Sequence, residues 1–278
     1  MINRNSKRLL AFSLTAIMVL AIVPAANSVY ATPASRSLIL LIDCSGSISP
    51  ANFGLMVGAY NAAFNDPAVI AALTSGTGTA VEAIAFGASN GVIVPWSHIT
   101  NAADSIAFGA AIGAFTQASC PGGTSATDMD GAINTAVIEF GTNPHAGGTK
   151  IIDLTTDGFP SNAAATTAAA AAAQAAGVTT LNALGIGPGA SLPYLSSIIF
   201  GPMSFANLVP DFAAFQQAIL DKIILETTPV AGIILPINTI ALLLAGVQSS
   251  MIWLVPAIAG VIGTGFYFTK GHWNKSED

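Results

Sequence analysis

The sequence predicts an α/β fold, namely a doubly wound, mainly parallel sheet with one antiparallel edge strand, followed by a C-terminal transmembrane helix. Strand-like apolar segments alternate with helical segments from residue 37 to residue 226, which implies crossover connections and a sheet covered on both faces. Two strand-like runs, 80–87 and 90–96, are separated by a short turn and predict the antiparallel pair. Residues 233–268 carry no charge, as a membrane segment requires.

The first strand is expected at 37–43, because SLILLID is a short continuous apolar run of the kind found in central parallel strands. A helix should follow at 50–66, with Ser49 as its N-cap and Pro50 in its first turn. Further helices are expected at 102–115, 126–140, 163–177, 191–199 and 211–226, and further strands at 149–158, 178–186 and 203–209.

The N-terminus has the pattern of a secretory signal peptide at residues 1–31. Arg4, Lys7 and Arg8 precede a long apolar run, and the small-x-small tripeptide VYA ends at Ala31, where we expect cleavage. The alternative is a signal anchor that is not cleaved. In both cases the following segment is exported.

The C-terminus predicts one membrane span at residues 251–269, with Trp253 and Tyr267 near its two ends as interface anchors. The short tail 270–278 begins with positive charge, which favours the cytoplasmic side. We therefore expect a single-pass protein of the cell membrane, with residues 32–228 outside the cell as one ectodomain.

The apolar segment 229–250 is interpreted as a juxtamembrane linker. It could also extend the helix, lie along the interface or form one arm of a hairpin, although a hairpin would put the C-terminal lysines outside. The ectodomain has three basic side chains against twelve acidic ones. This acidic balance argues against nucleic acid as a partner and is compatible with cation binding.

Hard oxygen ligands gather at the end of the first predicted strand. Asp43, Ser45 and Ser47 are spaced two apart, so an extended segment directs them the same way. A carboxylate and two hydroxyls suit magnesium, calcium or manganese. Since three oxygens are too few, other loops must contribute, and Thr124 in CPGGTSA and Asp157 in LTTDGFP lie at matching places. The alternative is that these residues only cap helices.

These three motifs, in this order, resemble the metal-ion-dependent adhesion site of von Willebrand factor type A domains. The resemblance covers residues 36–228 and is greatest to a poorly characterised microbial branch, through segments such as KIIDLTTDG and LNALGI. It implies that the hydroxyls of Ser45, Ser47 and Thr124 bind a divalent cation, with Mg²⁺ preferred and Ca²⁺ or Mn²⁺ as alternatives. Asp43 and Asp157 would supply negative charge directly or through water.

The resemblance also implies that one coordination position stays open for an acidic group of a partner. We therefore expect cation-dependent protein binding or adhesion at the cell surface, and no enzymatic activity. The alternatives are a metal-dependent hydrolase and a structural envelope component with a fold-stabilising metal. The sequence lacks a G-x-S-x-G nucleophile elbow and a phosphate-binding loop, so no catalytic or cofactor-binding residue is assigned.

Cysteine, aspartate and histidine residues elsewhere in the ectodomain are further site candidates. Cys44 and Cys120, the only cysteines, lie in two of the converging loops. A disulfide between them is favoured over a Cys44 that points into the sheet. Asp153 lies about 13 Å along the strand from Asp157, so we expect a buried carboxylate bonded to hydroxyls or backbone. His98 and His145 are interpreted as isolated surface residues.

Overall fold

The computed structural model describes residues 33–228, which form a six-stranded sheet in the order β3-β2-β1-β4-β5-β6. Neighbouring strands run parallel except β2 and β3, which are antiparallel. The strands are β1 (Arg36–Asp43), β2 (Thr79–Phe86), β3 (Asn90–Ile99), β4 (Thr149–Thr156), β5 (Thr180–Ile186) and β6 (Ala206–Val209). The predicted parallel sheet with one antiparallel edge is confirmed.

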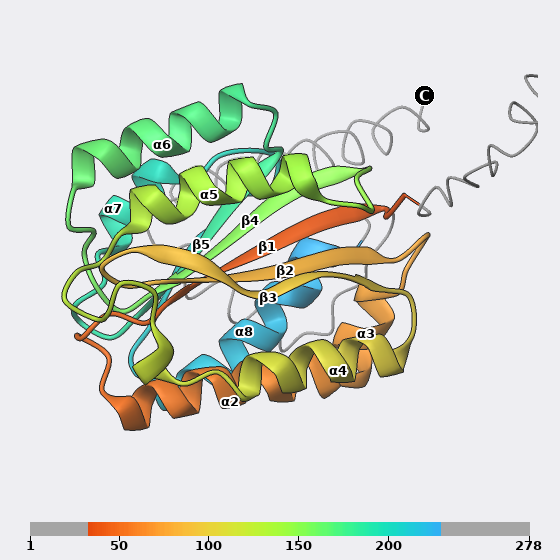
Figure 1. Cartoon of the computed structure of the whole chain (residues 1–278), viewed down its shortest axis with the longest axis horizontal. Coiled ribbons are helices and arrows are strands. Elements are labelled where there is room, and N and C mark those ends of the chain that lie inside the picture. Colours follow the sequence, from red (N-terminus) through yellow and green to blue (C-terminus); the bar gives the residue numbers. More distant parts are fainter. Residues whose placement is uncertain (1–32, 229–278) are drawn as a thin grey trace, which may run out of the picture. The chain divides into compact units, whose positions relative to one another are not determined.

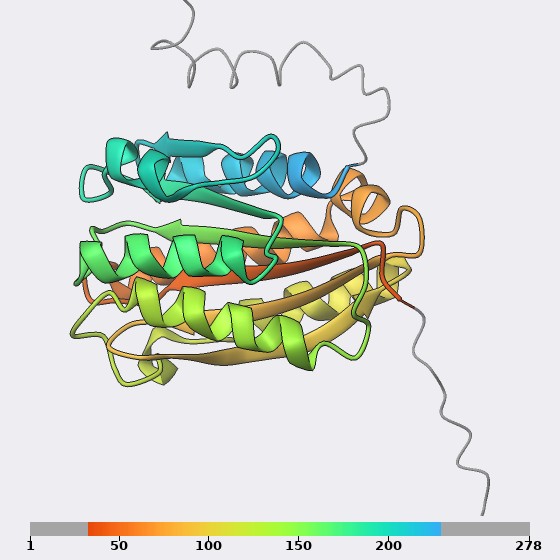
Figure 2. The ribbon, with the colours of Figure 1, turned by 90° about the horizontal axis from the view of Figure 1, so that it is seen from above.

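Helices cover both faces of the sheet, with α5, α6 and α7 on one face and α2, α3, α4 and α8 on the other (Figure 1). Figure 2 shows the same layers from above. The helices are α2 (Pro50–Asn65), α3 (Pro67–Leu73), α4 (Ala102–Gly113), α5 (Met129–Thr142), α6 (Ala163–Ala175), α7 (Leu192–Ile198) and α8 (Phe212–Thr227), with a short 3-10 helix η1 (Gln117–Ser119).

Local signals fix the helix boundaries. The Ser49 hydroxyl accepts a hydrogen bond from the Asn52 backbone N–H at the start of α2, as predicted. Asp66 ends α2 and also starts α3, where its carboxylate accepts from the Ala68 N–H and Pro67 occupies the first turn. Helix α3 was not predicted, although the pair Asp66–Pro67 carries the usual helix-start signal.

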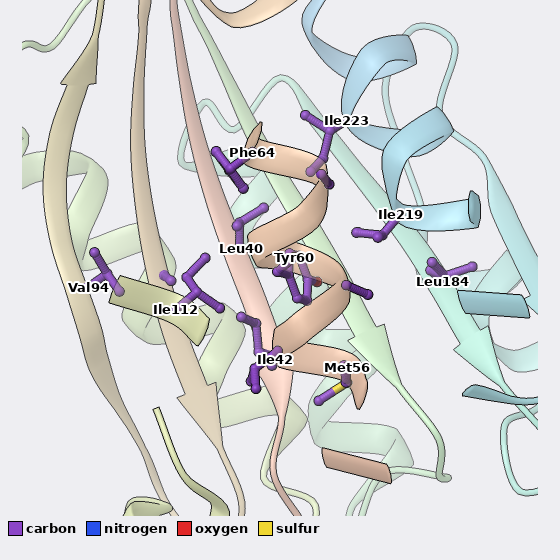
Figure 3. Close-up of a cluster of buried hydrophobic side chains, with 14 of the residues drawn as sticks. Leu40, Ile42, Met56, Tyr60, Phe64, Val94, Ile112, Leu184, Ile219 and Ile223 are labelled. Atoms are coloured by element: carbon purple, nitrogen blue, oxygen red, sulfur yellow. The ribbon is translucent and has the colours of Figure 1, made fainter. Parts of the chain in front are cut away.

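The two faces of the sheet bury separate apolar clusters, because successive strand residues point to opposite sides. Figure 3 shows the cluster beneath α2 and α8, where Leu40 and Ile42 of β1 contact the helices together with Tyr60, Phe64 and Ile219. The other cluster packs Ile39 and Leu41 of the same strand against α5, α6 and α7. The apolar run of β1 is therefore buried on both faces, as a central strand requires.

A buried ionic cluster ties α8 to the sheet. Lys222 of α8 pairs with Asp153 of β4 and, at 3.2 Å, with Glu226 one turn further along the helix. Asn182 of β5 donates a hydrogen bond of 2.8 Å to the same Glu226 carboxylate. Asp153 is buried, as predicted, but the expectation of a hydroxyl or backbone partner was wrong. Its partner is Lys222, which lies 69 residues away in the chain.

Both ends of the described domain lie at the amino-terminal ends of the strands. The Ala34 N–H donates to the His145 carbonyl near the start of β4. Thr228 lines a cavity together with Arg36 and Thr149, the first residues of β1 and β4. The chain therefore enters and leaves the domain at the end of the sheet where β1 and β4 begin. This end is opposite the one at which those strands finish (Figure 1).

The predicted signal peptide 1–31, the linker 229–250, the membrane span 251–269 and the tail 270–278 lie outside the described residues and stay predictions. Across residues 33–228, none of the helices combines the length and the apolar character that crossing a membrane would need.

Candidate metal site at the carboxyl ends of β1 and β4

Asp43 is the last residue of β1 and is fully buried. One carboxylate oxygen accepts a 2.8 Å hydrogen bond from the Ser45 backbone N–H, and the other accepts a 2.6 Å bond from the Thr156 hydroxyl. Burial raises the pKa of Asp43 to about 6, even though the bonds from Thr156 and Ser45 act in the opposite direction. The negative charge of Asp157 adds to this rise. Asp43 is thus held rigidly in a place that disfavours its own charge.

Ser45, Ser47 and Asp157 form a continuous hydrogen-bonded row. The hydroxyl oxygens of Ser45 and Ser47 lie 3.0 Å apart, and the Ser47 hydroxyl donates a 2.5 Å bond to Asp157. Ser45 is buried while Ser47 is exposed, so the row runs from the sheet to the surface. Burial raises the pKa of Asp157, and the bond from Ser47 lowers it.

Thr124 lies against this row through a close backbone approach. The Gly46 N–H donates a 2.7 Å bond to the Thr124 carbonyl. A Cβ atom on Gly46 would lie 3.0 Å from that carbonyl oxygen and 3.6 Å from the Thr124 hydroxyl. Glycine between Ser45 and Ser47 therefore lets the Thr124 loop reach the site. The structure brings all five predicted residues to one edge of the sheet.

The loop after β1 is held by a disulfide and by one glutamine. Cys44 and Cys120 are joined, with their Cα atoms 5.8 Å apart, which confirms the favoured prediction. The Gln117 side-chain amide donates to the carbonyls of Cys44 at 3.4 Å, Ser45 at 3.0 Å and Ile48 at 2.6 Å. The segment 117–120 thus fixes the backbone that presents Ser45 and Ser47.

Two positioning residues were missed from the sequence. Gln117 carries no local signal, because a single glutamine in a loop looks the same whatever it contacts. Thr156 could have been found, since it ends the strand beside β1 and Ile42 pairs with Thr155 in the parallel register. The next step of that register places Thr156 beside Asp43.

The charges and ligand types of the site fit a hard divalent cation. The basic residues Lys and Arg of the described domain are Arg36, Lys150 and Lys222. Arg36 and Lys150 lie at the amino-terminal strand ends, and Lys222 pairs with Asp153. The charges of Asp43 and Asp157 therefore have no basic partner within residues 33–228. Two carboxylates and three hydroxyls suit Mg²⁺, Ca²⁺ or Mn²⁺ rather than a softer ion.

Other metal candidates are weaker. Across residues 33–228, no group of three or more His, Cys, Asp and Glu residues is placed to hold an ion. His98 and His145 were expected to be isolated, but their ring centroids lie 4.5 Å apart, so that expectation was wrong. The His98 ring nitrogen Nε2 lies 2.8 Å from the Thr77 carbonyl, near the start of β2. The pair belongs to the sheet edge opposite the Asp43 site.

The fold is that of a von Willebrand factor type A domain, as the sequence motifs predicted. The chain is similar to proximal thread matrix protein 1 of the mussel byssus, with 20% identity and a TM-score of 0.54 over 70% of this chain and 48% of that one. Another structure of that protein, described as having a zinc-occupied metal-ion-dependent adhesion site, matches with the same identity and TM-score. The chain thus spans about half of the mussel protein.

Two bacterial structures show the same likeness. A von Willebrand factor type A protein from Catenulispora acidiphila has 19% identity and a TM-score of 0.54, over 69% of this chain and 42% of that one. BatB from Bacteroides thetaiotaomicron has 17% identity and a TM-score of 0.51, over 69% of this chain and 98% of that one. At such identities the likeness establishes the fold alone.

No curated protein matches the chain at a significant level. A family model described as a protein of unknown function (DUF1194) matches residues 34–231. The chain therefore belongs to the DUF1194 family, and its matched region coincides with the von Willebrand factor type A domain.

Proposed function

We propose that this domain binds a divalent cation at Asp43, Ser45, Ser47, Thr124 and Asp157, and that the cation captures an acidic group of a protein partner. The observation that carries the proposal is the row from buried Ser45 through exposed Ser47 to Asp157. It joins two loops at the carboxyl ends of parallel strands, the edge where ligands bind in open α/β sheets.

The chemistry of the five side chains favours capture of a carboxylate. The cation, when bound, supplies the positive charge that attracts a carboxylate. Ser45, Ser47 and Thr124 contribute neutral hydroxyls, so the ligand set carries only the charge of Asp43 and Asp157. Asp43 is held by Thr156 and Ser45, and its buried place makes it a fixed support for Ser45. Mg²⁺ is the preferred ion on these ligands, with Ca²⁺ and Mn²⁺ as alternatives.

A binding role suits the site better than a hydrolytic one. A hydrolase needs a base beside the ion. The histidines of the described domain, His98 and His145, lie near the opposite sheet edge, next to Thr77 and Ala34. We therefore propose a non-enzymatic role and give no catalytic assignment.

We further propose that the domain is held at the outside of the cell membrane by residues 251–269. The position of the domain's ends supports this arrangement, because Ala34 and Thr228 lie at the sheet edge away from Asp43 and Asp157. An anchor beyond residue 228 would be joined to the domain at the end away from Asp43 and Asp157. Protease added to intact cells should remove the ectodomain and spare a fragment that contains Lys270. Digestion of that tail from outside would contradict the proposed topology.

The metal proposal is tested with Mg²⁺ and the purified full chain. At a hundredfold excess over its dissociation constant, Mg²⁺ should stabilise the folded state by about 2.7 kcal/mol. Ser47→Ala should remove most of that gain. The matched control is Ser49→Ala, two residues away, which loses the α2 N-cap bond and about 1 kcal/mol of stability. It should keep the full Mg²⁺-dependent shift. An unshifted wild-type protein would rule out the metal site.

A further inference from the structure

An aromatic pair lies beside the candidate metal site. Phe159 follows Asp157 by two residues and is 51% exposed. Its ring centroid lies 4.6 Å from that of Tyr194 on α7. The Tyr194 hydroxyl donates a 3.0 Å bond to the Ala163 carbonyl at the start of α6. The loop after β4 and helix α7 therefore hold the two rings together, and the pair is named here the aromatic shelf.

The aromatic shelf is close to the metal ligands. Gly158 connects Asp157 to Phe159, and a Cβ atom on Gly158 would lie 3.5 Å from the Ser47 hydroxyl. Two residues of chain span at most about 7 Å, so the Phe159 Cα lies within that distance of the Asp157 Cα. Phe159 therefore lies within reach of a partner that contacts the row from Ser47 to Asp157.

Other exposed apolar side chains do not share these features. Leu55 on α2 and Ile138 on α5 are 56% and 65% exposed. Single apolar residues of this kind are normal on protein surfaces. Phe159 differs because a second aromatic ring supports it and because it adjoins a site for a charged ligand. Half-exposed aromatic rings beside a polar centre are typical of residues that gain most from burial by a partner.

From this arrangement we infer that the partner is an extended protein segment with an acidic residue and a large apolar or aromatic residue two positions from it. The inference rests on the proposed function, because the acidic residue is the one that the cation binds. Residues two apart in an extended segment face the same way and lie about 6.6 Å apart. That spacing lies within the limit of about 7 Å that chain geometry sets between the Cα atoms of Asp157 and Phe159. The carboxylate would then bind the cation while the apolar side chain covers the aromatic shelf.

Charge supports this kind of partner over a purely acidic one. The three basic residues of the described domain lie away from this edge, so the cation is the single positive centre offered there. One carboxylate satisfies that centre. A second acidic residue would face the charges of Asp43 and Asp157, whereas an apolar side chain gains contact with Phe159 and Tyr194.

The test uses displayed peptides with a fixed central glutamate and four random positions on either side, selected on the immobilised full chain in Mg²⁺. A matched library with central glutamine is selected in parallel, and both selections are repeated with chelator. Wild-type protein should enrich the glutamate library and, within it, large apolar residues two positions from the glutamate. Phe159→Ala should still select glutamate but lose the apolar preference, and should bind the best peptide about tenfold more weakly.

Two further variants and one further measurement complete the test. Phe159→Trp should keep the apolar preference, because it keeps an aromatic surface at that place. Ile138→Ala, an exposed apolar residue about 13 Å along α5 from its start, should behave as wild type. An unchanged Mg²⁺-dependent melting shift in Phe159→Ala should show that the metal site is intact.

Three results overturn the inference, and they distinguish a failure of the aromatic shelf from a failure of the proposed function. Wild-type protein could select glutamate without an apolar preference, or Phe159→Ala could show the same apolar preference as wild type. Either result would rule out a role of the aromatic shelf in binding and would leave the proposed function unaffected. Equal enrichment of the glutamate and glutamine libraries would rule out capture of a carboxylate, and with it both the proposed function and the inference.

Discussion

The Ser47 hydroxyl donates a 2.5 Å hydrogen bond to the Asp157 carboxylate, although 110 residues separate the two in the chain. Ser47 lies in the loop after β1 and Asp157 in the loop after β4, and these strands are parallel neighbours. The fold itself therefore brings the loops together, and the cation does not have to assemble them. A preorganised site of this kind loses little conformational freedom on binding.

The disulfide between Cys44 and Cys120 should stabilise the domain strongly. It closes a loop with a sequence separation of 76 residues, for which the chain-entropy relation gives about 4.5 kcal/mol. Reductant should therefore lower the free energy of unfolding of the wild-type chain by about that amount, measured by denaturant titration. Replacing both cysteines by alanine should lower it similarly and remove the effect of reductant. Equal stability of oxidised and reduced wild-type protein would contradict this prediction.

Lys222 should be essential for the stability of the fold. It is 3% exposed and lies between Asp153 and Glu226. Burial and the neighbouring charge of Asp153 raise the pKa of Glu226 to about 8, whereas the positive charge of Lys222 acts in the opposite direction. Lys222→Met leaves Asp153 buried without its cation and should cost about 3–5 kcal/mol.

The matched control for Lys222 is Lys150→Met. The Lys150 ammonium lies 5.7 Å from the centre of the Phe140 ring, nearer the surface. Such a contact contributes about 0.5–1 kcal/mol. Denaturant unfolding of the two variants should therefore differ by several kcal/mol. If both variants lost the same free energy of unfolding, the buried cluster would contribute no more to stability than the contact of Lys150 with Phe140.

The fold was largely predictable because its signals are local. The central strand at 37–43 is an uninterrupted apolar run, and Ser49–Pro50 and Asp211 carry helix-start signals that act within one turn. Helix α3 was missed because a seven-residue helix offers too few turns for an apolar period to show.

The candidate site was only partly predictable. The motif around Asp43, whose spacing is visible in the sequence, predicted that the site lies where the parallel strands end. The contacts of Gln117 and Lys222 depend on which loops and helices meet, and residue type does not reveal them. The contact of Thr156 with Asp43 follows only once β4 is known to lie beside β1. The contact between His98 and His145 was missed for the same reason, since it joins β3 to the loop after α5.

Glu82 should make the stability of the domain depend on pH. It is 2% exposed on β2, and its carboxylate oxygen Oε1 has no hydrogen-bond partner in the described residues. Burial, with a smaller contribution from the charge of Glu139, raises the pKa of Glu82 to about 7. An unfolded glutamate titrates near pH ~4.3. Between these values the folded state binds more protons, so the free energy of unfolding falls as the pH rises.

Glu82→Gln should remove this contribution. The variant should melt higher than wild type at pH 8 by roughly 3 °C or more, and the two should converge near pH 5. Glu139→Gln, at a half-buried position on α5, is the control: it removes only the smaller cause of the raised pKa of Glu82, so it should change the melting temperature less than Glu82→Gln does. A constant difference between Glu82→Gln and wild type across the pH range would exclude titration of Glu82 as the cause.

Removal of the Asp157 charge should separate metal binding from stability. Asp43 and Asp157 repel each other without a cation, so Asp157→Asn should raise the melting temperature in chelator. The asparagine carbonyl can still accept the bond from Ser47. The same change should abolish most of the Mg²⁺-dependent shift, because it removes half of the negative charge of the proposed ligand set.

Asp43→Ala should behave differently from Asp157→Asn. It leaves the Ser45 N–H and the Thr156 hydroxyl without their acceptor in a buried place, at a cost of about 1–3 kcal/mol for each group. We therefore expect Asp43→Ala to melt lower in chelator and to lose the Mg²⁺ shift. Thr124→Ala should weaken that shift and leave the melting temperature in chelator nearly unchanged. Melting curves of the three variants and wild type, with and without Mg²⁺, measure all these differences. A full Mg²⁺ shift in Asp157→Asn and Asp43→Ala would mean that the motif around Asp43 is only a hydrogen-bonded turn.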